Sequence, residues 1–182
     1  MSSPLVPTRA SGDASAAGVV VWLTGLPSSG KSAFAERVRA RLEAAGRACC
    51  TLDGDAVRAA LTPTPGYDDA SRDAFYATLA GLAALLARQG LIVLVPATAH
   101  RAAYRARARA LAPRLLEVWV ATSAATCAAR DAKGLYAAAR TGTIAGLPGL
   151  GAVYEPPEHP EVIVREGHAD EAVEALLAAI GV

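Results

Sequence analysis

The octapeptide at residues 25–32, which reads GLPSSGKS, constrains the fold of this chain more than any other segment. It fits the pattern G-x-x-x-x-G-K-[S/T], in which small residues let successive backbone N–H groups turn inward around phosphate oxygens. The run before it, VVVWLT at residues 19–24, is apolar and rich in β-branched residues, which predicts a strand buried on both faces. A helix is expected over residues 31–45, so that its positive N-terminus faces the phosphate.

This loop predicts a nucleoside triphosphate as ligand. Lys31 is expected to reach the β- and γ-phosphates, and the Ser32 hydroxyl is expected to ligate Mg²⁺. A glycine turn that merely joins a strand to a helix is the alternative, and it is disfavoured because Lys and Ser follow directly. The predicted nucleotide-binding residues are Gly25, Leu26, Pro27, Ser28, Ser29, Gly30, Lys31 and Ser32.

The rest of the chain alternates between strand-like and helix-like segments. Further strands are expected at residues 49–52, 91–95, 115–121 and 162–164, and further helices at 69–88, 102–111, 123–130 and 170–180. This alternation predicts an α/β fold: one P-loop domain over residues 19–182, with five parallel strands in the order 2-3-1-4-5 and helices on both faces. Residues 1–18 are predicted to form a flexible leader, and the Gly- and Pro-rich residues 131–160 a movable flap.

Composition excludes several functional classes. The net charge is +1, which argues against a nucleic-acid binder or a polybasic membrane anchor, and no run of 18 apolar residues occurs. Three cysteines without metal-ligand spacing argue against a zinc site or a disulfide framework and favour a reducing cytoplasm. Arginines in residues 101–114 are interpreted as a solvated helix face, and Trp22 and Trp119 as core residues.

An acidic pair, Asp53 and Asp55, follows the second predicted strand. One carboxylate can order the water shell of Mg²⁺ while the other accepts the proton of an acceptor hydroxyl. Arg58, a few residues further on, could hold an acceptor phosphate through two parallel hydrogen bonds. The alternative is a polar turn with Asp55 as a helix cap.

Four segments, VVWLTGLPSSGKS, LDGDAVR, RDAKGLY and YEPPEHPE, occur in the order and at the spacing of one family. From about Gly18 to its C-terminus the chain resembles the adenylyl-sulfate kinases, a branch of the P-loop small-molecule kinases. The resemblance implies transfer of the γ-phosphoryl group of ATP to the 3′-hydroxyl of adenosine 5′-phosphosulfate, with Mg²⁺. It implies small-molecule nucleotide substrates only, and it leaves a homodimer open.

The resemblance also assigns residues. It implies that Asp53, Asp55 and Lys31 are catalytic, with Asp55 favoured as the base and Asp53 as an organiser of the metal together with Ser32. Arg58 and Arg72 match arginines that hold the phosphosulfate, and Tyr67 stands where the family stacks an aromatic ring on the acceptor adenine. The matching flap residues are Lys133, Gly134 and Leu135.

The acceptor side departs from the family pattern. Phe75 stands in place of an Asn that contacts the acceptor, Ala77 and Thr78 replace two basic residues, and Leu147 replaces a flap Phe. The family's Ser-Pro-Tyr-Arg reads here as residues 98–101, in which Thr98 keeps a hydroxyl and Arg101 keeps the charge. A kinase of the same build with another hydroxyl acceptor is therefore one alternative, and a nucleotide-binding regulatory module with little turnover is another.

Overall fold

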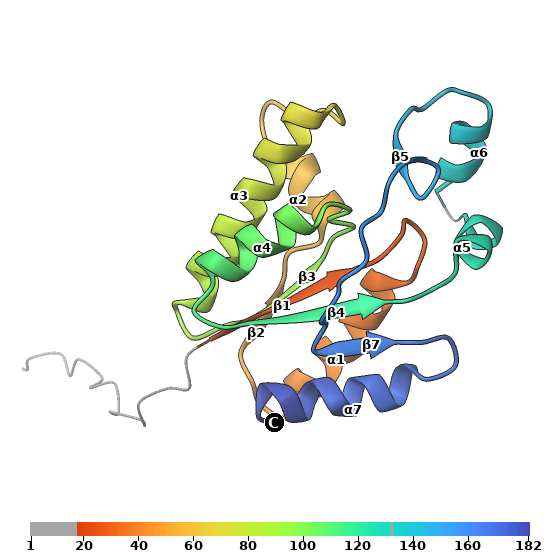
Figure 1. Cartoon of the computed structure of the whole chain (residues 1–182). Coiled ribbons are helices and arrows are strands. Elements are labelled where there is room, and N and C mark those ends of the chain that lie inside the picture. The colour runs from red at the N-terminus through yellow and green to blue at the C-terminus, as the bar shows by residue number, and fades with distance from the viewer. Residues whose placement is uncertain (1–17, 132) are drawn as a thin grey trace, which may run out of the picture.

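A five-stranded parallel sheet forms the centre of the computed structural model, which describes residues 18–131 and 133–182 (Figure 1). The strands lie in the order β2-β3-β1-β4-β7, so β1 occupies the middle of the sheet. Their bounds are β1 Val19–Thr24, β2 Cys49–Thr51, β3 Ile92–Pro96, β4 Leu115–Val120 and β7 Val162–Val164. Two short strands, β5 Leu147–Pro148 and β6 Gly151–Ala152, pair with each other outside this sheet.

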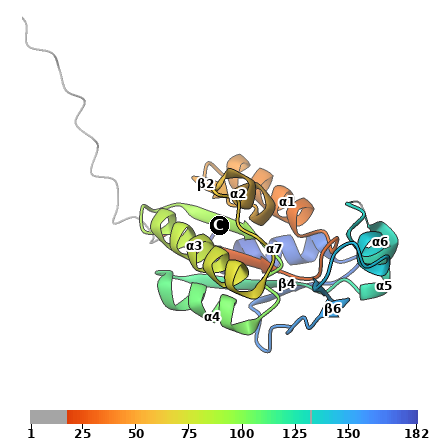
Figure 2. The ribbon, with the colours of Figure 1, turned by 90° about the horizontal axis from the view of Figure 1, so that it is seen from above.

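Seven helices are found within the described ranges. They are α1 Lys31–Ala44, α2 Gly54–Ala60, α3 Asp69–Ala87, α4 Ala102–Leu111, α5 Ala124–Arg130, α6 Leu135–Arg140 and α7 Ala169–Ile180. In Figures 1 and 2, α3 and α4 cover one face of the sheet and α1 and α7 cover the other. None of these helices combines the length and the apolar character that crossing a bilayer requires.

Alternation along β1 builds a core on each face of the sheet. Val21 and Leu23 pack with residues of α1 and α7, whereas Val20 and Trp22 pack with residues of α3 and α4. All six residues of β1 are buried, as the apolar run predicts. Fully burying one such side chain contributes about 1.5–3 kcal/mol. The strand that leads into the P-loop is therefore held by apolar packing on both faces of the sheet.

The predicted fold class and strand order are confirmed, since the fifth predicted strand is β7. The predicted flap region contains more regular structure than its composition indicates, namely α6, β5 and β6. The short helix α2 was raised only through the alternative that makes Asp55 a helix cap, because seven residues are too few for a helical period to stand out. Residues 1–17 of the predicted leader lie outside the described ranges.

Two expectations about side chains are wrong. Trp119 is only half-buried, because it lines an open pocket together with Tyr154 and Pro156. Arg105 is not part of a solvated helix face, since only 4% of it is exposed. Its guanidinium donates to Glu117 Oε1 at 2.6 Å, to the Ala99 carbonyl at 2.7 Å and to the Glu155 carbonyl at 2.8 Å. Charge spacing along a helix does not reveal such partners, which come from three separate segments.

We expect Arg105→Ala to lower the free energy of unfolding by about 3–5 kcal/mol, because the carbonyls of Ala99 and Glu155 lose their donor and Glu117 keeps only its 3.5 Å pair with Arg109. The control is Arg107→Ala on the same helix, where the guanidinium is 38% exposed and pairs with Asp73 at 3.2 Å. That change should cost less than about 1 kcal/mol. Urea unfolding of both variants tests this, and equal losses would contradict the structural role of Arg105.

Candidate active site

The P-loop, residues 25–30, joins β1 to α1 at the carboxyl edge of the sheet. A Cβ atom at Gly25 would lie 2.6 Å from the Val120 carbonyl oxygen, so no other residue fits there. Gly30 has a φ of 100° and caps α1 without any side-chain hydrogen bond. The first N–H groups of α1 have no partner within their own helix, which makes this terminus suited to an anion.

Side chains from other elements hold the outer surface of the P-loop. The Thr122 hydroxyl donates to the Ser29 carbonyl at 2.9 Å, and the Tyr136 hydroxyl donates to the Pro27 carbonyl at 3.1 Å. Arg130 reaches the same Ser29 carbonyl at 3.4 Å. These residues were missed at the sequence level, because no motif spacing links the end of β4 or helices α5 and α6 to residues 25–30.

Lys31 lies inside the curve of the loop. Its Nζ donates to the carbonyls of Leu26 at 2.7 Å and Gly25 at 3.0 Å. Desolvation lowers the pKa of Lys31 to about 8, against the opposing attraction of Cys127, Asp55 and Asp53. In the free protein the amine therefore donates to neutral carbonyls of the P-loop, and burial disfavours its charged form.

The two predicted catalytic carboxylates have different surroundings. Asp53 Oδ2 accepts a 2.7 Å hydrogen bond from the Ser32 hydroxyl, and Asp53 Oδ1 accepts from the N–H groups of Asp55 at 3.0 Å and Ala56 at 3.3 Å. Asp53 is therefore the cap of α2, not Asp55 as the alternative reading of this segment had it. The Asp55 carboxylate forms an exposed ion pair with Lys133, and this hydrogen bond raises the pKa of Lys133.

The Ser32 and Asp53 oxygens fit a magnesium ion. Mg²⁺ usually takes one or two protein oxygens and completes its shell with phosphate and water. Among residues 18–131 and 133–182, no three Asp, Glu, His or Cys side chains gather in a way that could hold a metal. A metal at this site would therefore depend on the oxygens of a bound nucleotide.

Arg58 is enclosed by two aromatic rings. Its guanidinium carbon lies 3.9 Å from the centre of the Phe75 ring and 4.5 Å from that of Tyr67. Its Nη1 donates to the Gly66 carbonyl at 2.7 Å and to the Pro65 carbonyl at 3.0 Å. Phe75 is buried beneath the guanidinium, whereas 66% of Tyr67 is exposed. Stacking of Tyr67 on the acceptor adenine stays a prediction, as does a contact between the acceptor and Phe75.

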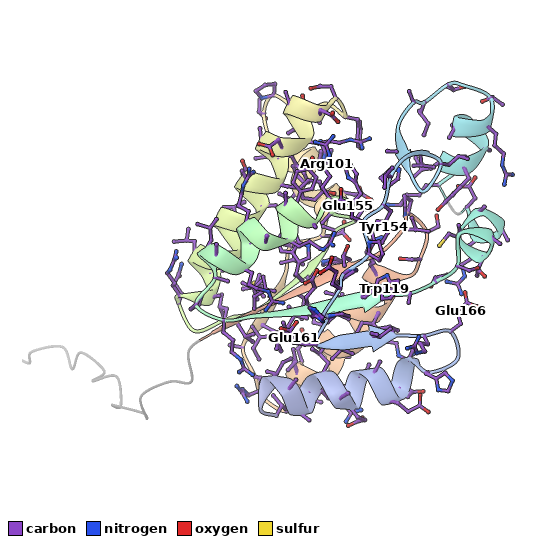
Figure 3. The ribbon with its side chains drawn as sticks, viewed as in Figure 1. Arg101, Trp119, Tyr154, Glu155, Glu161 and Glu166 are labelled. Carbon is purple, nitrogen blue, oxygen red and sulfur yellow. The ribbon has the colours of Figure 1, made fainter. Side chains whose placement is uncertain are left out.

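The other predicted acceptor residues lie along the same edge. Arg72 donates to the Gly146 carbonyl at 2.8 Å, and Arg101 pairs with Asp69 at 2.8 Å. The Thr98 carbonyl accepts from the Thr24 hydroxyl at 2.7 Å, and the Tyr154 hydroxyl lies 3.0 Å from the same Thr24 oxygen. Figure 3 shows Arg101, Glu155 and Tyr154 following one another between α4 and the end of β4.

Flap residues take two kinds of position. Gly134 precedes α6, which begins at Leu135, and the Asp131 carboxylate accepts from the first N–H groups of that helix. Leu147 is buried in a small cluster with Cys127 and Tyr136, against which Leu26 of the P-loop packs. The flap thus contacts the P-loop through apolar packing, and Leu147 as an acceptor contact stays a prediction.

Comparison with known proteins agrees with this geometry. The family model for adenylylsulphate kinase matches residues 17–165. An adenylyl-sulfate kinase of Chloroflexus aurantiacus is 41% identical over 165 residues, covering 90% of this chain and 89% of its own, and a probable one of Synechocystis is 40% identical over 148 residues, covering 81% and 84%. The solved APS kinase CysC of Mycobacterium tuberculosis in complex with AMPPNP and APS superimposes with a TM-score of 0.82, at 36% identity, over 87% of this chain and 97% of its own.

The lowered pKa of Lys31 predicts how nucleotide binding depends on pH. Below pH 7 the amine is charged in the free protein, so the Kd for ATP should be nearly constant. Above pH 8 the free amine is neutral, and binding must take up a proton because the phosphates favour the charged form. The Kd should then rise roughly tenfold per pH unit.

Calorimetric titration with ATP at pH 6.5–9.5, in buffers of different ionisation enthalpy, measures both the Kd and the proton uptake. Lys31→Arg is the control, because a guanidinium stays charged over this range and should remove the pH dependence. A wild-type Kd that does not change up to pH 9.5 would rule out this role for the lowered pKa.

Proposed function

Because the chain belongs to the adenylylsulphate kinase family, we propose that it transfers the γ-phosphoryl group of ATP to the 3′-hydroxyl of adenosine 5′-phosphosulfate. The observation that carries the proposal is the division of roles between the two carboxylates. Both oxygens of Asp53 are taken by Ser32 and the start of α2, whereas Asp55 is exposed and pairs with a flap lysine. One carboxylate is thus fixed beside the predicted metal site, and the other can accept a proton.

The reaction needs one nucleophilic displacement. The 3′-oxygen of the acceptor attacks the γ-phosphorus, the bond from this phosphorus to the β,γ-bridging oxygen breaks, and ADP leaves. Asp55 accepts the proton of the 3′-hydroxyl, and Lys31 stabilises the charge on the β- and γ-phosphates. When bound, Mg²⁺ neutralises charge on the phosphate oxygens, and Ser32 and Asp53 are the residues that would hold it.

We propose that three arginines bind the acceptor anion. Arg58, Arg72 and Arg101 come from α2, α3 and the loop after β3, and each donates to a carbonyl or a carboxylate. Arg58 uses Nη1 for two carbonyls, and no bond from its other nitrogens to a described residue is found. We propose that these other nitrogens, on a side chain that is 6% exposed, bind the phosphosulfate in the bidentate manner typical of Arg.

A kinase of the same build with another hydroxyl acceptor is the second candidate. The buried Phe75 in place of Asn, and the absence of the basic pair at Ala77 and Thr78, favour it. A regulatory module with little turnover is disfavoured, because Lys31, Asp53 and Asp55 are brought together with Lys133 at one edge. We further propose a cytoplasmic location, which the free thiols of Cys49, Cys50 and Cys127 support, and a homodimer.

Steady-state kinetics with the purified chain tests the acceptor. Adenosine 5′-phosphosulfate is compared with adenosine monophosphate and with other phosphorylated or sulfated nucleosides, by ADP release and by identification of the product. We expect a 3′-phosphorylated product from adenosine 5′-phosphosulfate. ADP release only with a different acceptor would favour the second candidate, and none with any acceptor would favour the regulatory module.

The two carboxylates should respond differently to the same substitution. Asp55→Asn keeps the shape but cannot accept the proton, so kcat should fall roughly 10²–10⁴-fold while the Kd for ATP changes little. Asp53→Asn should instead raise the Mg²⁺ concentration required for half-maximal rate and leave the cap of α2 nearly unchanged, because an amide oxygen accepts the same N–H groups. Magnesium titrations of the rate and thermal unfolding of both variants distinguish the roles. Retention of kcat by Asp55→Asn would remove this residue from the mechanism.

A further inference from the structure

The loop after β3, residues 97–101, contains a backbone conformation that needs support. Ala99 has a φ of 40°, in the left-handed region that residues with a Cβ atom rarely adopt, and its side chain is completely buried. Thr98 and Arg101, both predicted to contact the acceptor, lie on either side of it. The shape of this turn therefore determines where these two residues lie.

Two side chains form hydrogen bonds with the main-chain N–H and carbonyl groups of Ala99. The Ala99 N–H donates to the Tyr76 hydroxyl oxygen at 2.9 Å, and the Ala99 carbonyl accepts from Arg105 Nη1 at 2.7 Å. Both hydrogen bonds are buried, so losing either would leave a main-chain group without a partner away from water. Arg105 is itself fixed by Glu117 and by the Glu155 carbonyl.

Tyr76 is held in place by its neighbours. Its ring stacks on Tyr104 of α4, with centres 4.4 Å apart and planes at 20°, and meets the edge of Phe75 at 5.3 Å. The Tyr104 hydroxyl is buried and has no hydrogen-bond partner in the part of the chain that the structure describes. Both residues thus contact the loop, Tyr104 through its ring beside His100 and Arg101, but only the Tyr76 hydroxyl forms a hydrogen bond with it.

We propose that Tyr76 is a positioning residue for the phosphoryl acceptor, because its hydroxyl holds the left-handed turn at Ala99 that places Thr98 and Arg101 at the carboxyl edge of the sheet. The inference rests on the proposed function, since it concerns the same acceptor site. Proline, which the family pattern has at this position, cannot adopt a φ of 40° and has no N–H to donate. The turn that this loop adopts is therefore incompatible with proline at residue 99.

Tyr76→Phe removes one oxygen atom and tests the proposal. Because the Ala99 N–H then lacks its acceptor, we expect the KM for adenosine 5′-phosphosulfate to rise about tenfold. The KM for ATP and the Kd for ADP should stay within about twofold, because no contact links Tyr76 to the P-loop among the hydrogen bonds found. Tyr104→Phe is the matched control, since it deletes a hydroxyl from the partner ring without removing a bond, and its acceptor KM should equal that of the wild type.

Hydrogen exchange of the Ala99 amide gives a readout that does not depend on activity. Exchange should be faster in Tyr76→Phe than in the wild type and unchanged in Tyr104→Phe. Ala99→Gly keeps the N–H and adopts the turn without strain, so its acceptor KM and its exchange should stay close to the wild-type values. Ala99→Pro should raise the acceptor KM as Tyr76→Phe does, because it removes both the N–H and the turn.

The outcomes separate the two proposals. If the wild type does not phosphorylate adenosine 5′-phosphosulfate, the proposed function fails, while faster exchange in Tyr76→Phe would still establish the support of the turn. If the wild type is active and Tyr76→Phe lowers only the melting temperature, with the acceptor KM unchanged, Tyr76 is merely structural and the inference is overturned. Unchanged exchange in Tyr76→Phe would overturn it as well.

Discussion

The site depends on hydrogen bonds that the main-chain carbonyls of the P-loop accept from side chains elsewhere in the fold. Thr122 at the end of β4 and Tyr136 of α6 bind the carbonyls of Ser29 and Pro27, and Lys31 binds two more from inside the curve. With these carbonyls bound, the start of α1 remains available for an anion. A movement of α6 or of the end of β4 would therefore change the phosphate site directly.

On the predicted acceptor side, arginines rather than hydroxyl groups donate hydrogen bonds to the main-chain carbonyls of loops. Arg58, Arg72 and Arg105 all donate to main-chain carbonyls of loops at the carboxyl edge of the sheet. A guanidinium presents several donors in a fixed plane, so it can hold a loop with one edge while another remains available. Arg58 and Arg105 hold the loops that carry Tyr67 and Thr98 through contacts that are local in sequence, whereas Arg72 reaches a distant segment at Gly146.

The sequence predicted the elements with strong periodicity and the motif with fixed spacing. The buried run of β1, the helix that follows the P-loop, and the strand order were all found as expected, because they depend on local patterns and on the handedness of parallel connections. It gave α2 only as an alternative with the wrong cap, and it missed the buried ion pair of Arg105 with Glu117. The helix is too short to show a helical period. The ion pair joins α4 to β4, and no sequence motif links these two elements.

By itself, the sequence determined the P-loop of this protein. A phosphate-binding loop is made by residues adjacent in the chain, so their spacing in the sequence fixes their positions in space. Only the tertiary structure decided the different surroundings of Asp53 and Asp55, and the contact between Tyr76 and Ala99. These depend on which segments the sheet brings to one edge and on which atoms then come within hydrogen-bond distance. Residue types alone do not specify such distances, since they arise from the packing of helices on both faces of the sheet.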